Sequence, residues 1–211
     1  MNARLNDSHA RLLRSTLALA LLICFSGIKA AQALPITYTF SGVGNGRLGT
    51  STFSGSSFVI SCAADTSQIV DARGSFVAPV SVATIFVQGL GMATFTTPTM
   101  VTLNPFGSFV TFATSTYFPM NYVPIFSEFN NAALASYNLA TAIGPISGPA
   151  SGTSNPNLNN PIVTSAGNLS LQTISAASFQ ASVPDQSSTL ILLGVGLVAI
   201  RFTLRTIKNP I

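Results

Sequence analysis

Between residues 34 and 183 the chain alternates apolar and polar residues over short stretches that are interrupted by Gly, Pro, Asn and Ser. Successive side chains of a strand point to opposite faces, so this alternation predicts half-buried β-strands. Residues 58–62 are the clearest case, because Phe58, Ile60 and Cys62 fall on one face. The strands expected on this basis are 36–40, 48–53, 58–62, 83–87, 92–96, 100–103, 109–112, 168–173 and 177–183.

Turn signals separate these strands. Asn45-Gly46 is a strong hairpin signal, because a type I′ turn needs positive φ at both central residues, and we expect it to join 36–40 to 48–53. Residues 89–91 and 104–107 are further turns, 117–124 and 144–161 are loops, and 124–137 is the one expected helix. Short, evenly spaced strands predict an all-β domain over residues 34–182, an antiparallel β-sandwich or jelly roll.

Charge is scarce and sits at the two ends of the chain. Only 7% of the 211 residues are charged and the formal net charge is +4, whereas soluble domains average about 25% charged residues. Four cations precede residue 34 and three follow residue 200. The segment between them holds two arginines and three carboxylates, a net charge of −1. So little positive charge excludes a nucleic-acid partner for the expected domain.

Residues 1–33 have the three parts of a secretory signal peptide. Arginines precede an apolar core at 17–25, which is too short to span a bilayer because a spanning helix needs about 20 residues. Small residues, Ala31 and Ala33, occupy the positions typical of a cleavage site, so Leu34 is the expected mature N-terminus. We therefore expect export through the general secretion machinery.

A second apolar segment at 187–204 predicts a transmembrane helix. Its length corresponds to about 27 Å of helix, close to the thickness of a hydrocarbon core. The basic tail at 201–211 contains Arg201, Arg205 and Lys208, which indicates a cytoplasmic C-terminus. Arg201 reaches the headgroups by extending its side chain along the helix.

The segment ahead of this helix is rich in small polar residues, and Pro184 keeps it extended by fixing φ and removing a backbone donor. The order Val-Pro-acid, small polar residues, apolar helix with Gly-x-Gly and basic end resembles the PEP-CTERM protein-sorting tail, in its Val-Pro-Asp variant. The resemblance covers residues 183–208 and places the sorting motif at Val183, Pro184, Asp185, Gln186, Ser187, Ser188 and Thr189.

The resemblance implies a route for the protein. Such chains are exported by Gram-negative bacteria, held transiently in the membrane by the tail, and cleaved by an exosortase that releases or re-attaches the body at the cell surface. The family is associated with exopolysaccharide and biofilm matrix. Residues 38–42, Gly49 and 58–62 followed by Asp65-Thr66 also resemble the start of uncharacterised β-rich ectodomains that carry this tail, a group without a known activity.

The residue types of the expected domain disfavour catalysis. The one histidine is His9, in the signal peptide, so the mature chain lacks the imidazole that Ser-His or Cys-His nucleophiles and histidine-ligated zinc require. Cys62 stands alone after signal cleavage and is expected to be a small buried apolar residue, a reactive thiol being the alternative. We therefore expect no enzyme and no cofactor.

Three carboxylates remain as candidate ligands. Asp65, Asp71 and Glu128 are expected to solvate turns or to pair with arginine, while Ca²⁺ binding by Asp65 and Asp71 is the weaker alternative and glycosidase chemistry the weakest. The aromatics at Tyr117, Phe118, Tyr122 and Phe126 are a candidate sugar-stacking platform, with packing as the alternative. The leading hypothesis is a structural or interaction protein of the cell surface or matrix; the second is an exopolysaccharide-binding module; a secreted hydrolase ranks below both.

Overall fold

The computed structural model describes residues 34–117, 121–128, 131–152 and 162–184. The elements in this part of the chain are strands and two short 3₁₀ helices, η1 (Thr66–Gln68) and η2 (Ala132–Ser136). The strands are β1 (Pro35–Leu48), β2 (Ser51–Asp65), β3 (Val70–Ala72), β4 (Ser75–Val87), β5 (Gly91–Thr94), β6 (Thr99–Asn104), β7 (Phe109–Tyr117), β8 (Asn121–Glu128), β9 (Ile143–Ser147), β10 (Ala150–Gly152), β11 (Val163–Thr164) and β12 (Gly167–Ser182).

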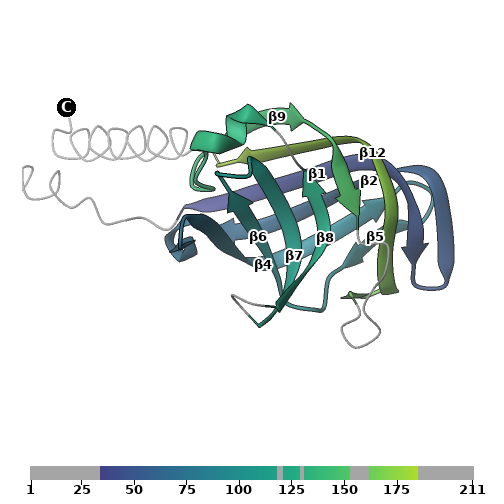
Figure 1. The fold of residues 1–211 in the computed structure, drawn as a ribbon. Helices are drawn as coiled ribbons and strands as arrows, with labels where there is room; N and C mark the ends of the chain where they lie inside the picture. The colour runs from purple at the N-terminus through teal and green to yellow at the C-terminus, as the bar shows by residue number, and fades with distance from the viewer. Residues whose placement is uncertain (1–33, 118–120, 129–130, 153–161, 185–211) are drawn as a thin grey trace, which may run out of the picture. The chain divides into compact units, whose positions relative to one another are not determined.

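These strands form one antiparallel sheet of 12 strands in the order β10-β8-β7-β6-β4-β2-β1-β12-β11, with β3 and β5 on β4 and β9 on β12. Most neighbours are consecutive in the sequence, but the last strand, β12, returns to pair with the first, β1. The sheet curls strongly (Figure 1). Its far end approaches β12, because a Cβ on Gly152 of β10 would lie 2.5 Å from the carbonyl oxygen of Leu171.

The prediction of an all-β antiparallel domain is confirmed, while the connections differ from those of a jelly roll. Among the described strands, the order is a meander that curls until its two halves face each other, and the facing layers are parts of one sheet. Long strands allow this: β1, β2 and β12 have 14, 15 and 16 residues. Register shifts in the pairing of β1 bend these strands, as β-bulges do, so that one strand serves both layers.

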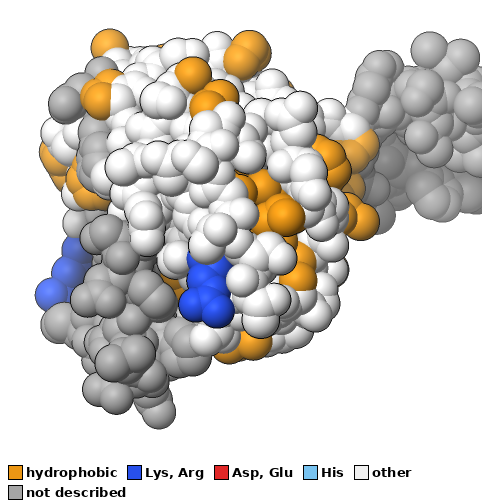
Figure 2. Space-filling view, turned by 90° about the vertical axis from the view of Figure 1, so that its right-hand side faces the viewer, with side chains coloured by type: hydrophobic (Ala, Val, Ile, Leu, Met, Phe, Trp, Pro, Cys, Tyr) orange, Lys and Arg blue, Asp and Glu red, His pale blue; other side chains and the backbone are white. Residues whose placement is uncertain are grey.

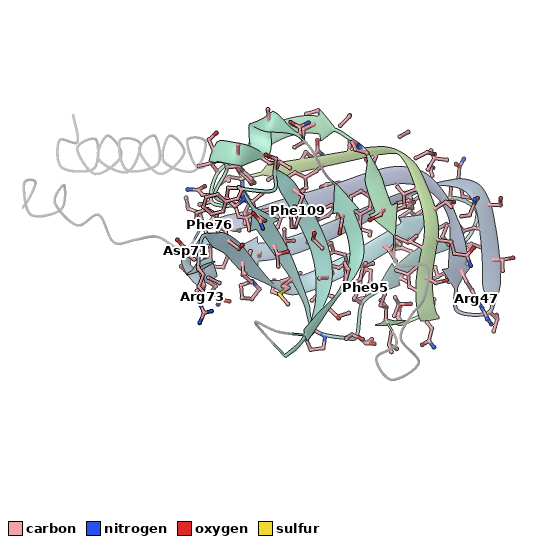
Figure 3. The ribbon with its side chains drawn as sticks, in the orientation of Figure 1. Arg47, Asp71, Arg73, Phe76, Phe95 and Phe109 are labelled. Atoms are coloured by element: carbon pink, nitrogen blue, oxygen red, sulfur yellow. The ribbon has the colours of Figure 1, made fainter. Side chains whose placement is uncertain are left out.

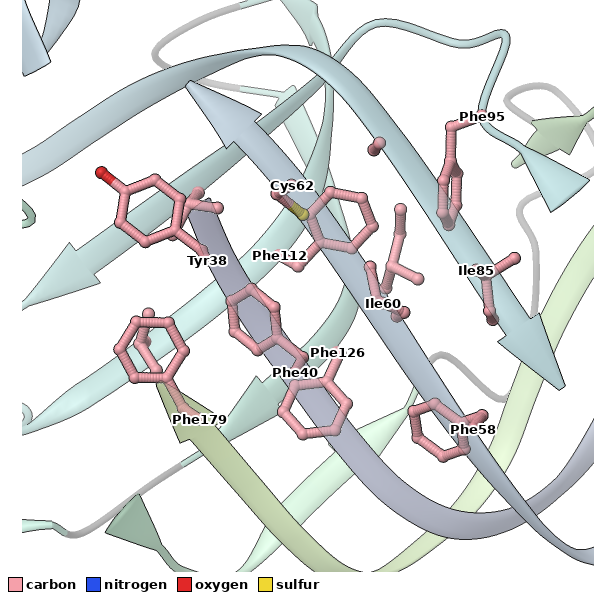
Figure 4. Packing of buried hydrophobic residues seen from close by; sticks show 14 of the residues in the cluster. Tyr38, Phe40, Phe58, Ile60, Cys62, Ile85, Phe95, Phe112, Phe126 and Phe179 are labelled. Atoms are coloured by element: carbon pink, nitrogen blue, oxygen red, sulfur yellow. The ribbon is translucent and has the colours of Figure 1, made fainter. Parts of the chain in front are cut away.

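The core lies inside the curl and is dominated by phenylalanine. Phe58, Ile60 and Cys62 of β2 are at most 1% exposed, which confirms the face predicted from their alternation. Phe40 of β1 lies at the centre: its ring centroid is 5.0 Å from that of Phe179, and two further rings, Phe112 and Phe126, lie at 6.0 and 5.2 Å (Figure 4). Such pairs add about 0.5–1.5 kcal/mol each beyond the buried area.

The predicted turn at Asn45-Gly46 is wrong. β1 continues to Leu48, and the hairpin turns at Gly49, whose φ is +61°. Asn45 lies instead at a bulge, where the register of β1 shifts against both β2 and β12. Its amide stabilises the bulge, because Oδ1 accepts hydrogen bonds from Ser54 Oγ (2.9 Å) and Gly55 N (2.7 Å), and Nδ2 donates to Thr173 Oγ1 (2.8 Å).

The predicted helix at 124–137 is also wrong, and so is much of the predicted loop structure around it. Residues 124–128 belong to β8, and among the described residues of the range the only helical part is η2, which Asn131 caps through its side chain. β7 and β8 take up most of 117–124, and β9 and β10 take up the first part of 144–161. The turns at 89–91 and 104–107 are confirmed, and the strands expected at 168–173 and 177–183 are one strand, β12.

The predicted signal peptide and most of the predicted sorting tail lie outside the described residues. Ala31 and Ala33 belong to the first segment and Asp185, Gln186, Ser187, Ser188, Thr189, Arg201, Arg205 and Lys208 to the second. Within the part of the chain that is described, no helix is long and apolar enough to cross a membrane.

Candidate functional site

The residues that flank the two predicted processing points lie at one end of the β1–β12 pair. Thr37 pairs with Ser182, the last residue of β12. Leu34 is tied to the domain through Thr66, since its N–H donates to Thr66 Oγ1 (3.2 Å) and its carbonyl accepts from Thr66 N (3.0 Å). On the other strand, Val183 packs partly buried against the core, and Pro184 is exposed. The Val-Pro pair therefore follows the folded sheet directly.

The two candidate calcium ligands each cap a turn. Asp65 caps η1: its Oδ1 accepts hydrogen bonds from Ser67 N (2.8 Å) and Ser67 Oγ (2.7 Å). Asp71 Oδ1 accepts from Gly74 N (2.8 Å) in the turn between β3 and β4. Both described carboxylates thus accept hydrogen bonds within turns. Within the described residues no group of three His, Cys, Asp or Glu side chains is close enough to hold a metal ion. The side chain of Glu128 lies outside the description.

The buried ionisable groups are neutral packing residues. Cys62 is fully buried, as predicted, and burial raises the pKa of its thiol well above the ordinary value. Burial also raises the pKa of Tyr38 and Tyr137, whose hydroxyls donate to the carbonyl oxygens of Leu139 and Thr141, both at 2.8 Å. A neutral thiol and neutral phenols that already donate to backbone offer neither a nucleophile nor a base.

One aromatic residue of the predicted sugar-stacking platform is buried in the core. Phe126 is 0% exposed and packs edge-on against Phe40 and Phe58. It points inward because it pairs with Phe112 on β7, and directly opposed residues of paired strands share a face. The side chains of Tyr117, Phe118 and Tyr122 lie outside the description.

An open groove of about 1010 Å³, which the sequence did not predict, lies at the turn ends of β1, β2 and β12. Most of the side chains that line it are uncharged polar groups, and its one charged side chain is Arg47. Figure 3 places Arg47 at the opposite end of the domain from Asp71 and Arg73. Figure 2 looks onto the right-hand side of Figure 1 and shows a largely uncharged surface, with basic but no acidic side chains visible among the residues it colours.

Strand register explains the polar lining. Arg47 lies in the ladder between Thr52 of β2 and Ser170 of β12. Alternate residues, Leu48 and Leu169, are buried, so the polar residues of all three strands face outward together. Arg47 is held in place because its Nε donates to the carbonyl oxygen of Gly49 (2.7 Å).

Two glycines let the turns that border the groove meet. Gly49, in the β1–β2 turn, and Gly167, at the start of β12, have φ of +61° and +107°. A Cβ on Gly167 would lie 2.8 Å from Gly49 Cα, and a Cβ on Gly49 would overlap the carbonyl oxygen of Ala166. Larger residues would therefore force the turns apart and widen the groove.

The groove could not be found from the sequence because its two halves are far apart along the chain. Polar residues alternate with apolar ones in both halves, 45–54 and 166–172, but the pairing of β1 with β12 brings them together. Comparison with known proteins gives no further help: no protein-family description, no curated protein and no solved structure matches this chain.

Proposed function

We propose that this chain is an exported bacterial protein of the cell surface or extracellular matrix, sorted by a C-terminal exosortase-type signal. The observation that carries the proposal is the order of residues in the tail: Val183-Pro184-Asp185, small polar residues, an apolar segment and a basic end. In this scheme the general secretion machinery exports the chain and removes residues 1–33, and the segment 187–204 holds the domain at the membrane until an exosortase-like enzyme cleaves near the motif.

The immediate junction between the sheet and the motif supports this order of events. β12 ends at Ser182 and Pro184 is exposed, so the folded domain stops where the motif starts. A protease needs an extended substrate, and proline cannot continue a strand ladder as a donor. The domain thus leaves Pro184 exposed while Val183 remains packed on the core.

We assign the domain, a sandwich-like body made from one curled sheet, a structural or interaction role. The segment that forms it has no histidine and no lysine, Cys62 is buried, and both described carboxylates cap turns. Catalysis by acid–base or nucleophilic routes needs an accessible group with a matched pKa.

Mass spectrometry of the protein released from the surface of its source cells tests the sorting proposal. The expected product begins at Leu34 and lacks peptides from 189–208. Pro184→Ala should slow this processing and accumulate the uncleaved chain, whereas Pro149→Ala, a change at another exposed proline, should not. Recovery of intact 189–208 peptides from the released wild-type protein would contradict the proposal.

A second candidate function, an exopolysaccharide-binding module, is favoured by the polar groove. Amide and hydroxyl side chains on three adjacent strands offer donors and acceptors in a row. Both functions are compatible with one protein, since a matrix protein must contact the matrix. In this proposal the sorting signal determines the location of the domain, and the groove determines the ligand that it binds.

A further inference from the structure

The free hydrogen-bonding capacity of the groove is concentrated on two strands, β2 and β12. Thr52 of β2 and Ser170 and Gln172 of β12 line it, and none of these side chains hydrogen-bonds to another residue of the described chain. Asn45, by contrast, makes three side-chain hydrogen bonds in the bulge, which hold its amide in place. Hydroxyl and amide groups each donate and accept, which matches the hydroxyl groups of sugars.

The charge in the groove is a single positive one. Arg47 is exposed, and the groove has no carboxylate in its lining. The hydrogen bond from Nε to Gly49 fixes one edge of the guanidinium and leaves its terminal nitrogens for a ligand. Those nitrogens form a fork that matches the two oxygens of a carboxylate. The described acids do not compete, since Asp65 and Asp71 are engaged in their own turns.

Other ligand classes fit this lining poorly. One cation is too few for a nucleic-acid backbone, whose binding requires several phosphate contacts. The two large apolar side chains of the lining, Phe53 and Leu169, are 7% and 0% exposed, so neither offers a side chain for an apolar peptide to pack against. The same burial removes Phe53 as a stacking surface for an unsubstituted sugar face. A polyhydroxylated ligand with sparse negative charge satisfies both the hydroxyl row and the arginine.

We propose that this groove binds an acidic oligosaccharide, with Arg47 pairing a uronic-acid carboxylate and Thr52, Ser170 and Gln172 bonding the sugar hydroxyls. The inference rests on the second candidate function above and specifies its ligand and site. The open groove receives a segment of a chain, so binding should strengthen from the monomer to the tetramer.

Calorimetric titration of the full chain, purified in a neutral detergent, with tetragalacturonate tests the proposal. The wild-type protein should bind saturably, and Arg47→Gln should weaken binding by about tenfold or more, the value of a charge-assisted hydrogen bond. Arg73→Gln is the matched control: it removes the same charge from a turn at the other end of the domain and should leave affinity unchanged. The carboxyl-reduced, neutral tetramer should bind the wild-type protein about tenfold more weakly and should not distinguish wild type from Arg47→Gln.

Three outcomes would overturn the inference. Equal weakening by Arg47→Gln and Arg73→Gln would show a diffuse charge effect. Binding of the neutral tetramer as tight as that of the acidic one would keep the carbohydrate-binding function and remove the role of Arg47. Absence of binding to both tetramers would remove that function as well, while the sorting proposal, which is read out by mass spectrometry, would stand. Arg47→Gln should unfold thermally at the same midpoint as the wild-type protein. A loss of binding then reflects the changed site and not a loss of folding.

Discussion

The inner and outer faces of β1 and β12 belong to the same strands and differ in every property that matters for function. Inward, Tyr38, Phe40 and Phe179 are 0% exposed and their rings pack together. Outward, Arg47 and Ser170 stand beside each other on a polar surface with one charge. The packed core therefore lies on the inner face and the binding that we propose falls on the outer face, so substitutions on the two faces should have separable effects.

Truncation at the centre of the inner face should have the largest effect. Phe40→Ala removes a ring that contacts three others, and a buried Phe→Ala change costs about 3–5 kcal/mol. This is a large part of the roughly 5–15 kcal/mol that stabilises a typical domain. Urea denaturation should show the loss. Phe40→Leu should lose less stability than Phe40→Ala. If Phe40→Ala lost as little as Phe40→Leu, the stabilising contacts would have to lie elsewhere in the core.

Gly46, where the backbones of β1 and β12 approach closely, should be the next most sensitive position to substitution. A Cβ on Gly46 would overlap the carbonyl oxygen of Ser170 and would lie 2.7 Å from Phe53 Cζ. Gly46→Ala should therefore push β1 away from β12 and cost about 1–3 kcal/mol in denaturation experiments. Gly144→Ala is the control, since its Cβ would meet nothing within 4 Å and its effect should stay within about 0.5 kcal/mol. Equal effects of the two changes would contradict the close approach of the strands.

Among the described ionisable groups, alkaline pH should act on the inner face. Burial raises the pKa of Tyr38 in the folded state above its ordinary value of 10.0, so the unfolded chain ionises first. The stabilisation is fully present below pH 10 and is lost as pH rises above it, by up to about 1.4 kcal/mol per pH unit for one group. Comparing denaturation midpoints at pH 8 and 10.5, Tyr38→Phe should lose about 1 kcal/mol less than wild type. An unchanged alkaline loss would assign the effect to Tyr137 and Cys62.

The outer face should be the least sensitive in stability. Arg47 is exposed and its described contact is one hydrogen bond to Gly49 O, so Arg47→Gln should change the free energy of unfolding by less than about 0.5 kcal/mol. Chemical denaturation in parallel with Phe40→Ala gives the sharpest contrast. A loss above 1 kcal/mol would mean that the arginine supports the turn, and the two faces would not be separable.

Alternation along single strands was the part of the fold that could be predicted. The inward face of β2 follows from Phe58, Ile60 and Cys62 because burial on one face imposes period two. Local turn chemistry was less dependable. Asn45-Gly46 has the residues of a hairpin turn, yet the amide of Asn45 makes its hydrogen bonds across a bulge and Gly49 supplies the positive φ.

Contacts between distant segments could not be predicted. The range 124–137 has helix-forming Ala and Leu and an early proline, but Phe126 is drawn into the core by pairing with Phe112 of β7. Tertiary burial of this kind overrides weak local propensity. The groove was missed for the same reason, because Arg47 and Ser170 become neighbours only when the first and last strands pair.

The pairing of the first strand with the last also sets the timing of folding. The hydroxyls of Ser41 and Ser178 lie 2.9 Å apart although 137 residues separate them. Non-local pairing of this kind slows folding, because the entropy cost of closing a long loop comes before any stabilising contact forms. Until β12 has been synthesised, β1 has one unpaired edge, the kind of edge that recruits other chains. The last of the described strands to be synthesised is therefore the one that pairs the free edge of β1.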